Sequence, residues 1–169
     1  MKTPNSKLTQ EQISLIVERA SSNSRDQLIL ELLSSCGLTV GELTSLKTKD
    51  INFQESTLTI PSTPRTLSLS SPLLEKLCSF TSKRRHLFKG YGGSLTPRRV
   101  QHIIKKYSEE AGFSNITSRT LRYSFALHFL KKTDDIQMLQ RVLGLKSFSS
   151  IANYLPYNGE STEIYTKGD

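Results

Sequence analysis

The sequence predicts an α+β protein that is mostly α-helical, with a small antiparallel sheet after the third helix. Two observations lead to this prediction. Along most of the chain, apolar residues recur every three or four positions, which is the period of an amphipathic helix. Between residues 51 and 70 they alternate with polar residues, many of them Thr and Ser, as in short strands. The length of 169 residues favours one domain over residues 1–169, with a flexible polar tail at about residues 157–169.

Capping residues mark the starts of the first three expected helices, because their side chains bind the free N–H groups of a first turn. The expected helices and N-caps are residues 8–22 with Thr9, residues 24–37 with Ser24, and residues 39–47 with Thr39. Gln12 and Glu42 each follow an N-cap by three positions, which completes the spacing of a capping box. Gly37 is expected to end the second helix.

The period of the pattern then changes. The segments INFQESTLTI (51–60) and RTLSLS (65–70) are expected to be antiparallel strands, joined abruptly by the stretch PSTP (61–64). Further helices follow, and two of them begin at a Ser-Pro or Thr-Pro pair, because proline fits the first turn of a helix. Their expected ranges are residues 71–82, 97–112, 118–130, 134–144 and 148–155.

The charge balance favours a polyanionic partner. The chain carries 23 Lys and Arg against 15 Asp and Glu, a formal net charge of +8, and such an excess attracts nucleic acid. Cys36 and Cys78 form no CxxC motif and lie on apolar stripes, so we expect two buried thiols in a reducing compartment. The three histidines are scattered, and we expect neither a metal nor another cofactor. The polar N-terminus and the lack of a membrane-length apolar run indicate a soluble cytoplasmic protein with no membrane partner.

The sixth expected helix carries two arginines three positions apart. Leu121, Phe125 and Phe129 share one face of this helix, whereas Arg119 and Arg122 lie together on another. A guanidinium group is always charged, and its planar fork suits phosphate oxygens. The pair is therefore either directed at a phosphate or part of the solvated side of the helix.

Four stretches, in this order along the chain, resemble the catalytic domain of the tyrosine recombinases, the phage-integrase and Xer/Cre family. They are SSCGLTVGELTSLKTKDINF, GYGGSLTPRRVQHIIKKYSEEAGF, TSRTLRYSFALHFL and IQMLQRVLGLKSFSSIANYL. The resemblance extends from about Leu8 to Tyr157 and implies the helical fold of that family. It also implies a reaction in which a tyrosine hydroxyl attacks a DNA phosphate. A 3′-phosphotyrosine link forms without metal or cofactor, while arginines hold the phosphate oxygens.

The resemblance assigns three roles in this sequence. Tyr154 occupies the position of the nucleophile, Arg122 that of the second phosphate-binding arginine, and Glu42 that of an acidic residue supporting the site. Each residue also has a structural interpretation. A tyrosine near a helix end commonly lies at the edge of the core, and Arg122 could form an ion pair with Glu42.

Four positions depart from the pattern of the family. Thr39 stands where the first arginine is expected, Arg119 replaces a histidine, and Leu145 replaces the histidine of the LGH motif. The strand connection that should carry a lysine offers only Arg65. Arg119 and Arg65 are candidate substitutes for the missing charge, whereas Thr39 is better explained as a helix cap. We therefore expect a recombinase fold with a degenerate active site and impaired activity.

The expected partner is double-stranded DNA, together with other recombinase protomers, and no small-molecule substrate is expected. The candidate DNA-binding residues are basic: Arg84, Arg85, Arg98, Arg99 and Lys105. Arg98 and Arg99 begin a helix, and a helix N-terminus also favours phosphate. The chain starts at the catalytic-type domain, so it is not expected to include an N-terminal DNA-clamping domain. Two alternatives stay open: a catalytically inactive DNA-binding relative with a regulatory or accessory role, and a basic helical interaction module without DNA function.

Overall fold

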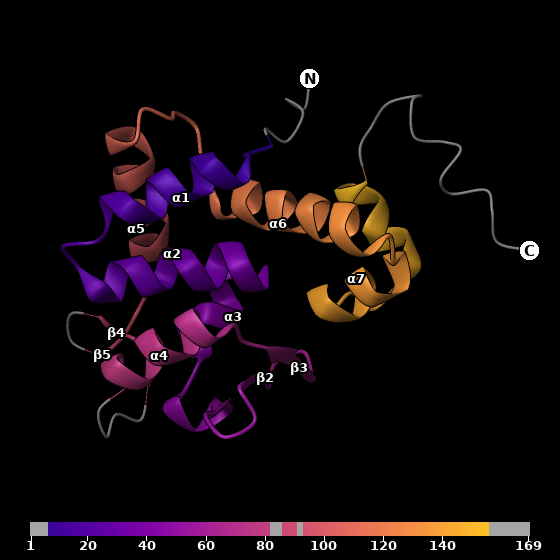
Figure 1. Ribbon diagram of the computed structural model, residues 1–169, viewed down its shortest axis with the longest axis horizontal. Coiled ribbons are helices and arrows are strands. Elements are labelled where there is room, and N and C mark those ends of the chain that lie inside the picture. Colours follow the sequence, from indigo (N-terminus) through magenta and orange to yellow (C-terminus); the bar gives the residue numbers. More distant parts are fainter. Residues whose placement is uncertain (1–6, 82–85, 91–92, 156–169) are drawn as a thin grey trace, which may run out of the picture.

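The structure is a computed structural model that describes residues 7–81, 86–90 and 93–155. Most of its elements are helices, with short strands between them (Figure 1). The α-helices are α1 (Gln10–Arg19), α2 (Ser24–Cys36), α3 (Val40–Ser45), α4 (Ser71–Phe80), α5 (Pro97–Glu110), α6 (Ser118–Thr133) and α7 (Ile136–Leu143). Two 3₁₀ helices are η1 (Thr48–Asp50) and η2 (Phe148–Tyr154). The strands are β1 (Ile51–Asn52), β2 (Thr57–Ile60), β3 (Arg65–Ser68), β4 (Lys89–Gly90) and β5 (Gly93–Ser94). The predicted fold class is confirmed.

The strands β1, β2 and β3 form an antiparallel sheet in sequence order. Leu58 in the middle strand pairs with Ile51 on one side and with Leu67 on the other, and all three side chains are buried. The apolar face of the sheet therefore packs into the protein, as the alternating pattern predicts. The connection between β2 and β3 is a tight turn, which brings the start of β3 close to the helices.

Two features of the strand region differ from the prediction. The stretch predicted as one strand over residues 51–60 is divided by a turn, in which Asn52 Oδ1 accepts hydrogen bonds from the backbone N–H groups of Gln54 and Glu55. An asparagine side chain that binds the backbone two residues ahead ends a strand in this way. The short pair β4 and β5 is a second sheet that the sequence did not indicate, because its glycines hide any apolar alternation.

The helix caps follow the prediction with one exception. Reciprocal capping boxes are present at α1 and α3, formed by Thr9 with Gln12 and by Thr39 with Glu42. The predicted cap of α2, Ser24, is wrong: Asn23 caps this helix by accepting the backbone N–H of Asp26. Asparagine is as good an N-cap as serine, and here it comes one position earlier. Gly37 ends α2 in the left-handed conformation, with φ of 60°, as its type predicts.

Two hydrophobic clusters make up the interior. The larger one surrounds α2, which packs against α1, α3, α4, α5 and α6. The smaller one lies between α6, α7 and η2, and its buried residues are Ala126, Leu139, Leu143 and Ile151. Helix α6 belongs to both, because Leu121 is buried in the larger cluster and Ala126 in the smaller. In Figure 1, α7 lies beside the C-terminal half of α6, and its other neighbours include strand β3.

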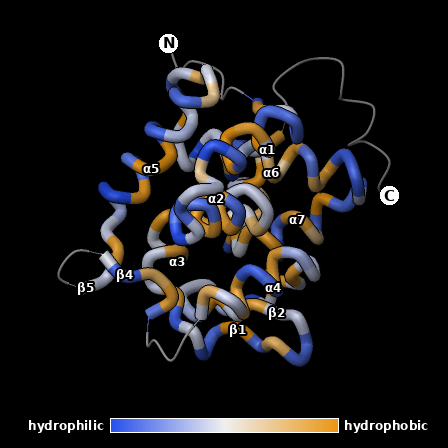
Figure 2. Tube along the Cα trace, turned by 60° about the vertical axis from the view of Figure 1, so that its left-hand side comes forward, coloured by the Kyte–Doolittle hydropathy of each residue, from blue (hydrophilic) through white to orange (hydrophobic). Residues whose placement is uncertain are grey.

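The surface agrees with the sequence patterns except at one thiol. In Figure 2, α5 runs along an edge of the molecule with hydrophilic segments on its outer side. Cys36 is buried as predicted, but the prediction is wrong for Cys78, which is exposed on α4. The buried stripe of α4 is formed by Leu73 and Leu77, and Cys78 falls beside it. Over the described ranges, no helix has the length and apolar character needed to cross a membrane.

Candidate active site

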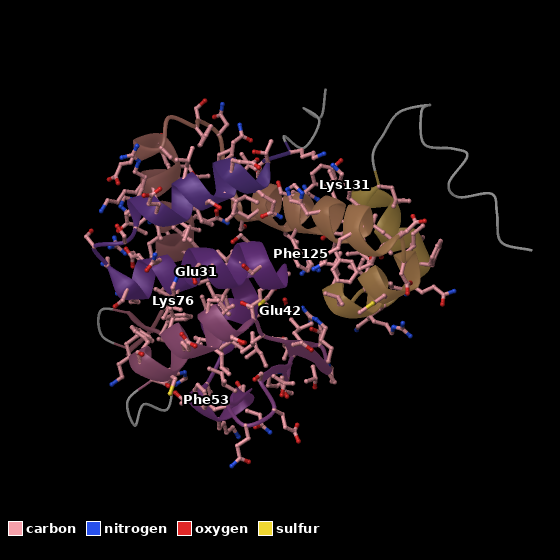
Figure 3. All side chains as sticks on the ribbon, viewed as in Figure 1. Glu31, Glu42, Phe53, Lys76, Phe125 and Lys131 are labelled. Carbon is pink, nitrogen blue, oxygen red and sulfur yellow. The ribbon has the colours of Figure 1, made fainter. Side chains whose placement is uncertain are left out.

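The candidate residues meet at the C-terminal ends of α2 and α7. Helix α3 carries Glu42, β3 begins at Arg65, α6 carries Arg122, and η2 ends at Tyr154. In Figure 3, Glu42 lies on the side of α3 that faces α7. The two helix ends contribute backbone carbonyl oxygens, which have no partner within their own helices.

Arg122 is the centre of this cluster. Its guanidinium group is buried and donates through all three nitrogens: Nε to Tyr154 Oη at 2.9 Å, Nη2 to the carbonyl oxygen of Leu143 at 2.8 Å, and Nη1 to the carbonyl oxygen of Gly37. Leu143 ends α7, and Gly37 follows the end of α2. A cation is favourable at both places, because the C-terminal end of a helix carries a partial negative charge.

Tyr154 is half-buried and packs against the smaller cluster. Besides the hydrogen bond from Nε, the Arg122 guanidinium carbon lies 5.6 Å from the centre of the Tyr154 ring, a cation–π distance. The residues predicted to be nucleophile and phosphate ligand are therefore in direct contact, although they are 32 positions apart in sequence.

Among the described residues, Glu42 is the acidic side chain that is paired with both Arg65 and Arg122. Oε1 accepts from Thr63 Oγ1 and from Arg65 Nη1, both at 2.6 Å, and Oε2 accepts from the backbone N–H of Thr39 at 2.8 Å and from Arg65 Nη2 at 3.1 Å. Arg122 Nη1 lies farther away, 3.8 Å from Oε2. Burial alone would raise the pKa of the Glu42 carboxyl, but the hydrogen bonds from Arg65, Thr63 and Thr39 and the charge of Arg65 lower that pKa from 4.5 to about 2.

Arg65 lies inside the site rather than on its surface. Besides the two bonds to Glu42, its Nη1 donates to Thr63 Oγ1 and its Nε donates to the carbonyl oxygen of Val142, in the last turn of α7, at 2.7 Å. Gly144 makes room for it, since a Cβ atom at that glycine would lie 2.6 Å from Arg65 Nη1. The structure therefore brings this candidate substitute for the missing charge to the site, bound to Glu42 and to protein oxygens.

The other departures from the family pattern have different surroundings. Thr39 is the N-cap of α3: its hydroxyl accepts the backbone N–H of Glu42 at 3.2 Å, as predicted. Arg119 is exposed on the first turn of α6, and among the described residues it has neither a hydrogen bond nor an ion pair. Leu145 is half-buried against the smaller cluster and offers no side-chain donor.

The candidate DNA-binding residues of α5 are all exposed. Arg98 and Arg99 lie in its first turn, and Lys105 forms an exposed ion pair with Glu109 at 3.8 Å. Such an exposed pair contributes little to stability, so it does not hold Lys105 away from other partners. The remaining candidates, Arg84 and Arg85, lie outside the described residues.

Several contributors to the site carry no signal in the sequence. Thr63 donates to Glu42 from the turn between β2 and β3, and the backbone carbonyl oxygens of Gly37, Val142 and Leu143 accept from the two arginines. For Gly37, the sequence predicts that the residue ends a helix, but it does not predict the bond from Arg122 to its carbonyl oxygen. In the described part of the chain, no group of three or more His, Cys, Asp or Glu could hold a metal ion.

The arrangement can hold a negative charge beside a hydroxyl group. Two buried guanidinium groups face one buried carboxylate, which leaves one positive charge in excess next to Tyr154 Oη. In a buried site such a charge acts strongly, because little water screens it. The helical fold with its small antiparallel sheet is that of the tyrosine-recombinase class.

Comparison with known proteins supports the same class. The family model described as "Phage integrase family" matches residues 6–160, so the chain belongs to the phage integrase family. The tyrosine recombinase XerA of Pyrococcus furiosus is 34% identical, over 98% of this chain and 58% of its own length.

Solved structures show the same fold. The crystal structure of XerA recombinase superimposes with a TM-score of 0.82 and 26% identity, covering 95% of this chain and 62% of that one. The XerH site-specific recombinase bound to its difH substrate gives a TM-score of 0.81 at 21% identity, covering 96% of this chain and 54% of that one. This chain spans less than two thirds of each of these relatives.

Proposed function

We propose that this chain binds double-stranded DNA and takes part in site-specific cleavage and rejoining through a 3′-phosphotyrosine link at Tyr154. The observation that carries the proposal is the 2.9 Å hydrogen bond from Arg122 Nε to Tyr154 Oη. It joins a hydroxyl that can act as nucleophile to a guanidinium group that suits phosphate oxygens. Membership of the phage integrase family supports this function over an interaction module without DNA function.

In the proposed reaction, Tyr154 Oη forms a bond to the scissile phosphorus, and the bond from phosphorus to the 5′ oxygen of the next nucleotide breaks. The phenol gives up its proton and the leaving oxygen takes one up, so a 5′ hydroxyl is released. Attack of a 5′ hydroxyl on the phosphotyrosine reverses these steps and rejoins a strand. The transition state gains negative charge, which Arg122 would stabilise by donating to phosphate oxygens.

Arg119 would supply a second positive charge one helical turn from Arg122. It is exposed and has no hydrogen bond or ion pair in the described part of the chain, so binding a phosphate would break no internal contact. Arg65 would contribute charge without contact, because its fork is directed at Glu42 and at the carbonyl oxygen of Val142.

The exposed basic side of α5 would bind the DNA backbone. Gln101 Nε2 donates to Ser118 Oγ at 2.8 Å, which ties this side of α5 to the first turn of α6, next to Arg119. Exposed charges on two adjoining helices can follow a phosphate backbone together. The residues we propose for this surface are Arg98, Arg99 and Lys105, with Arg84 and Arg85 added on the sequence pattern alone.

We also propose that residues 1–169 act as one catalytic-type domain, in the cytoplasm and at the nucleoid when bound to DNA.

Further recombinase protomers are proposed as partners, because strand exchange joins two DNA sites and needs more than one nucleophile. The XerH neighbour is described in complex with its difH substrate, which supports DNA as the partner of this fold.

A second candidate function is DNA binding without cleavage, and one observation favours it. Every nitrogen of the Arg122 guanidinium already donates to a protein oxygen, so binding a phosphate would require exchanging at least one of these bonds. Thr39 and Leu145 also lack the donors that their positions carry in the family. Each missing preorganised donor typically costs roughly 3 to 4 kcal/mol of transition-state stabilisation. We therefore expect slow cleavage at most.

A covalent trap tests the two candidates. The protein and Tyr154→Phe are each incubated with a nicked duplex from the neighbouring genomic DNA, so that the cleaved fragment diffuses away and the adduct accumulates. A band that survives denaturing detergent with the wild type and is absent with Tyr154→Phe supports cleavage at Tyr154. Salt-sensitive binding of the same duplex without any adduct supports the binding-only function. If the protein forms no adduct and also shows no salt-sensitive binding to the duplex, both candidate functions are contradicted.

A further inference from the structure

We propose that Arg65 is a positioning residue: it holds both oxygens of the Glu42 carboxylate and thereby keeps Arg122 directed at Tyr154 rather than at Glu42. This inference rests on the proposed function, since Arg122 is the phosphate ligand of that proposal. It assigns Arg65 a role different from a replacement phosphate ligand. The contacts of Glu42, Arg65 and Arg122 that support this inference all join described residues.

The distances show how Glu42 is shared. Arg65 approaches Oε1 at 2.6 Å and Oε2 at 3.1 Å, so its planar fork covers both oxygens. Arg122 Nη1 stays 3.8 Å from Oε2, beyond hydrogen-bond distance, and all three of its nitrogens donate elsewhere. The carboxylate is thus occupied by one arginine, and the other arginine is available to the tyrosine.

Because all three side chains are buried, the pairing of Glu42 with Arg65 has a strong effect on Arg122. The side chains of Glu42, Arg65 and Arg122 are 6%, 7% and 9% exposed, so their charges interact with little screening by water. Two guanidinium groups and one carboxylate leave one positive charge in excess. Without Arg65, Arg122 would be the remaining cation beside the buried Glu42 carboxylate. The attraction between these two charges would then draw the Arg122 guanidinium group the short distance to the carboxylate.

The position of Arg65 is itself fixed by its surroundings. Its Nε donates to the carbonyl oxygen of Val142 at 2.7 Å, and Gly144 offers no side chain that would displace it. Only a planar fork with donors on both edges can bind Glu42 and Val142 together, which a lysine ammonium group cannot do. Strand β3 therefore supplies a fixed positive charge to α3 and α7 at once.

The first test observes Arg122 directly and needs no activity. Arginine side chains are labelled with ¹⁵N, and the Nε–H resonance of Arg122 is assigned with the help of Arg122→Lys. Arg65→Gln is expected to shift this resonance and to speed its exchange with water, because Arg122 turns toward Glu42. Glu42→Gln alone and the double variant Glu42→Gln/Arg65→Gln are expected to leave it close to wild type, since no carboxylate competes for Arg122.

The pattern across these variants separates positioning from a general structural role. If breaking the pair from either side, by Glu42→Gln or by Arg65→Gln, moves the resonance equally, the inference is overturned. Arg19→Gln is the matched control: it removes an exposed arginine from the end of α1 and should change nothing at Arg122. If Arg65→Gln does not fold, Arg65→Lys takes its place. It keeps the charge but loses the fork, and a smaller shift in the same direction supports the inference, whereas no shift overturns it.

The second test uses the covalent trap. Arg65→Gln is expected to slow adduct formation by roughly tenfold, and removing Glu42 as well is expected to restore part of the rate. If the double variant Glu42→Gln/Arg65→Gln forms the adduct no faster than Arg65→Gln, the inference is overturned. The loss of structural bonds would then explain the slow adduct formation of both variants. If the wild type forms no adduct, the proposed cleavage fails, and the resonance of Arg122 still decides the role of Arg65.

Discussion

Arg122 Nε donates to Tyr154 Oη at 2.9 Å, while the other two nitrogens of the same guanidinium group bind carbonyl oxygens at the ends of α2 and α7. One side chain therefore joins three segments that are distant in sequence. These bonds tie the fold together at the residue for which we propose a role in the reaction.

The arginines three positions apart on α6 should differ sharply in their effect on stability. Arg122→Ala leaves the carbonyl oxygens of Gly37 and Leu143 without partners inside the protein, and we expect the free energy of unfolding to fall by about 3 kcal/mol. Arg119→Ala removes an exposed side chain with no partner in the described residues and should change it by less than about 0.5 kcal/mol. Urea unfolding of both variants measures this difference, and equal losses would contradict the buried role of Arg122.

Acid should destabilise the protein through Glu42. Its pKa is about 2 in the folded protein and 4.5 ordinarily, so the unfolded chain takes up the proton first as the pH falls. The resulting stabilisation, about 3 kcal/mol, is complete above pH 4.5 and is lost progressively toward pH 2. Urea unfolding at several pH values should show this loss in wild type and a flatter dependence in Glu42→Gln. Thr63→Val removes one of the hydrogen bonds to Glu42 and should give an intermediate slope. A Glu42→Gln variant with the wild-type slope would rule out this origin.

Two glycines four positions apart should respond oppositely to alanine. Gly37 has φ of 60°, and a Cβ atom there would collide with the ring of Phe125, which is labelled in Figure 3. Gly37→Ala should therefore lower the melting temperature, with a cost of about 2 kcal/mol or more. Gly41 lies in α3 with open space around its Cα, so Gly41→Ala should gain up to about 1 kcal/mol from helix propensity. A tolerated Gly37→Ala would mean that Phe125 can move away from the site.

The basic side of α5 should set the salt dependence of DNA binding. We expect Arg98→Gln and Arg99→Gln each to reduce the slope of log K against log salt by about 1, because each removes one phosphate contact. Lys131→Gln is the control for the same loss of charge, since Lys131 lies near the opposite end of α6 from Arg119 (Figure 3). Fluorescence anisotropy with a labelled duplex measures the slopes. Equal slopes for all three variants would place the DNA elsewhere.

The local features of the fold are predictable from the sequence, because they depend on neighbouring residues. The capping boxes at Thr9 and Thr39 and the helix end at Gly37 are examples. Asn23 was missed although it obeys the same rule, since Ser24 beside it is an equally good cap. The exposure of Cys78 depends on a small rotation of α4 that hydrophobic spacing does not resolve.

The candidate site was predictable only in part, because its chemistry depends on long-range contacts. The sequence pattern identifies Arg122 and Tyr154, and the structure brings them together. The same pattern identifies Arg65 only as a positive charge near the site. Its burial follows from a bond to Val142, 77 positions away, and from the space at Gly144. No rule based on neighbouring residues links a strand start to the last turn of a helix so far along the chain.

The division of the interior into two clusters bears on how Tyr154 is presented. The tyrosine packs against the smaller cluster, whose buried side chains are Ala126, Leu139, Leu143 and Ile151. Arg122 is bound both to Leu143 of that cluster and to Gly37 at the end of α2, in the larger one. A small cluster can open locally at a lower free energy than the whole fold. Such an opening would carry η2 away from Arg122 while α2 and its neighbours stay folded. The frequency of this partial opening, as well as the charges around the phenol, would then govern how often the hydroxyl is free to react.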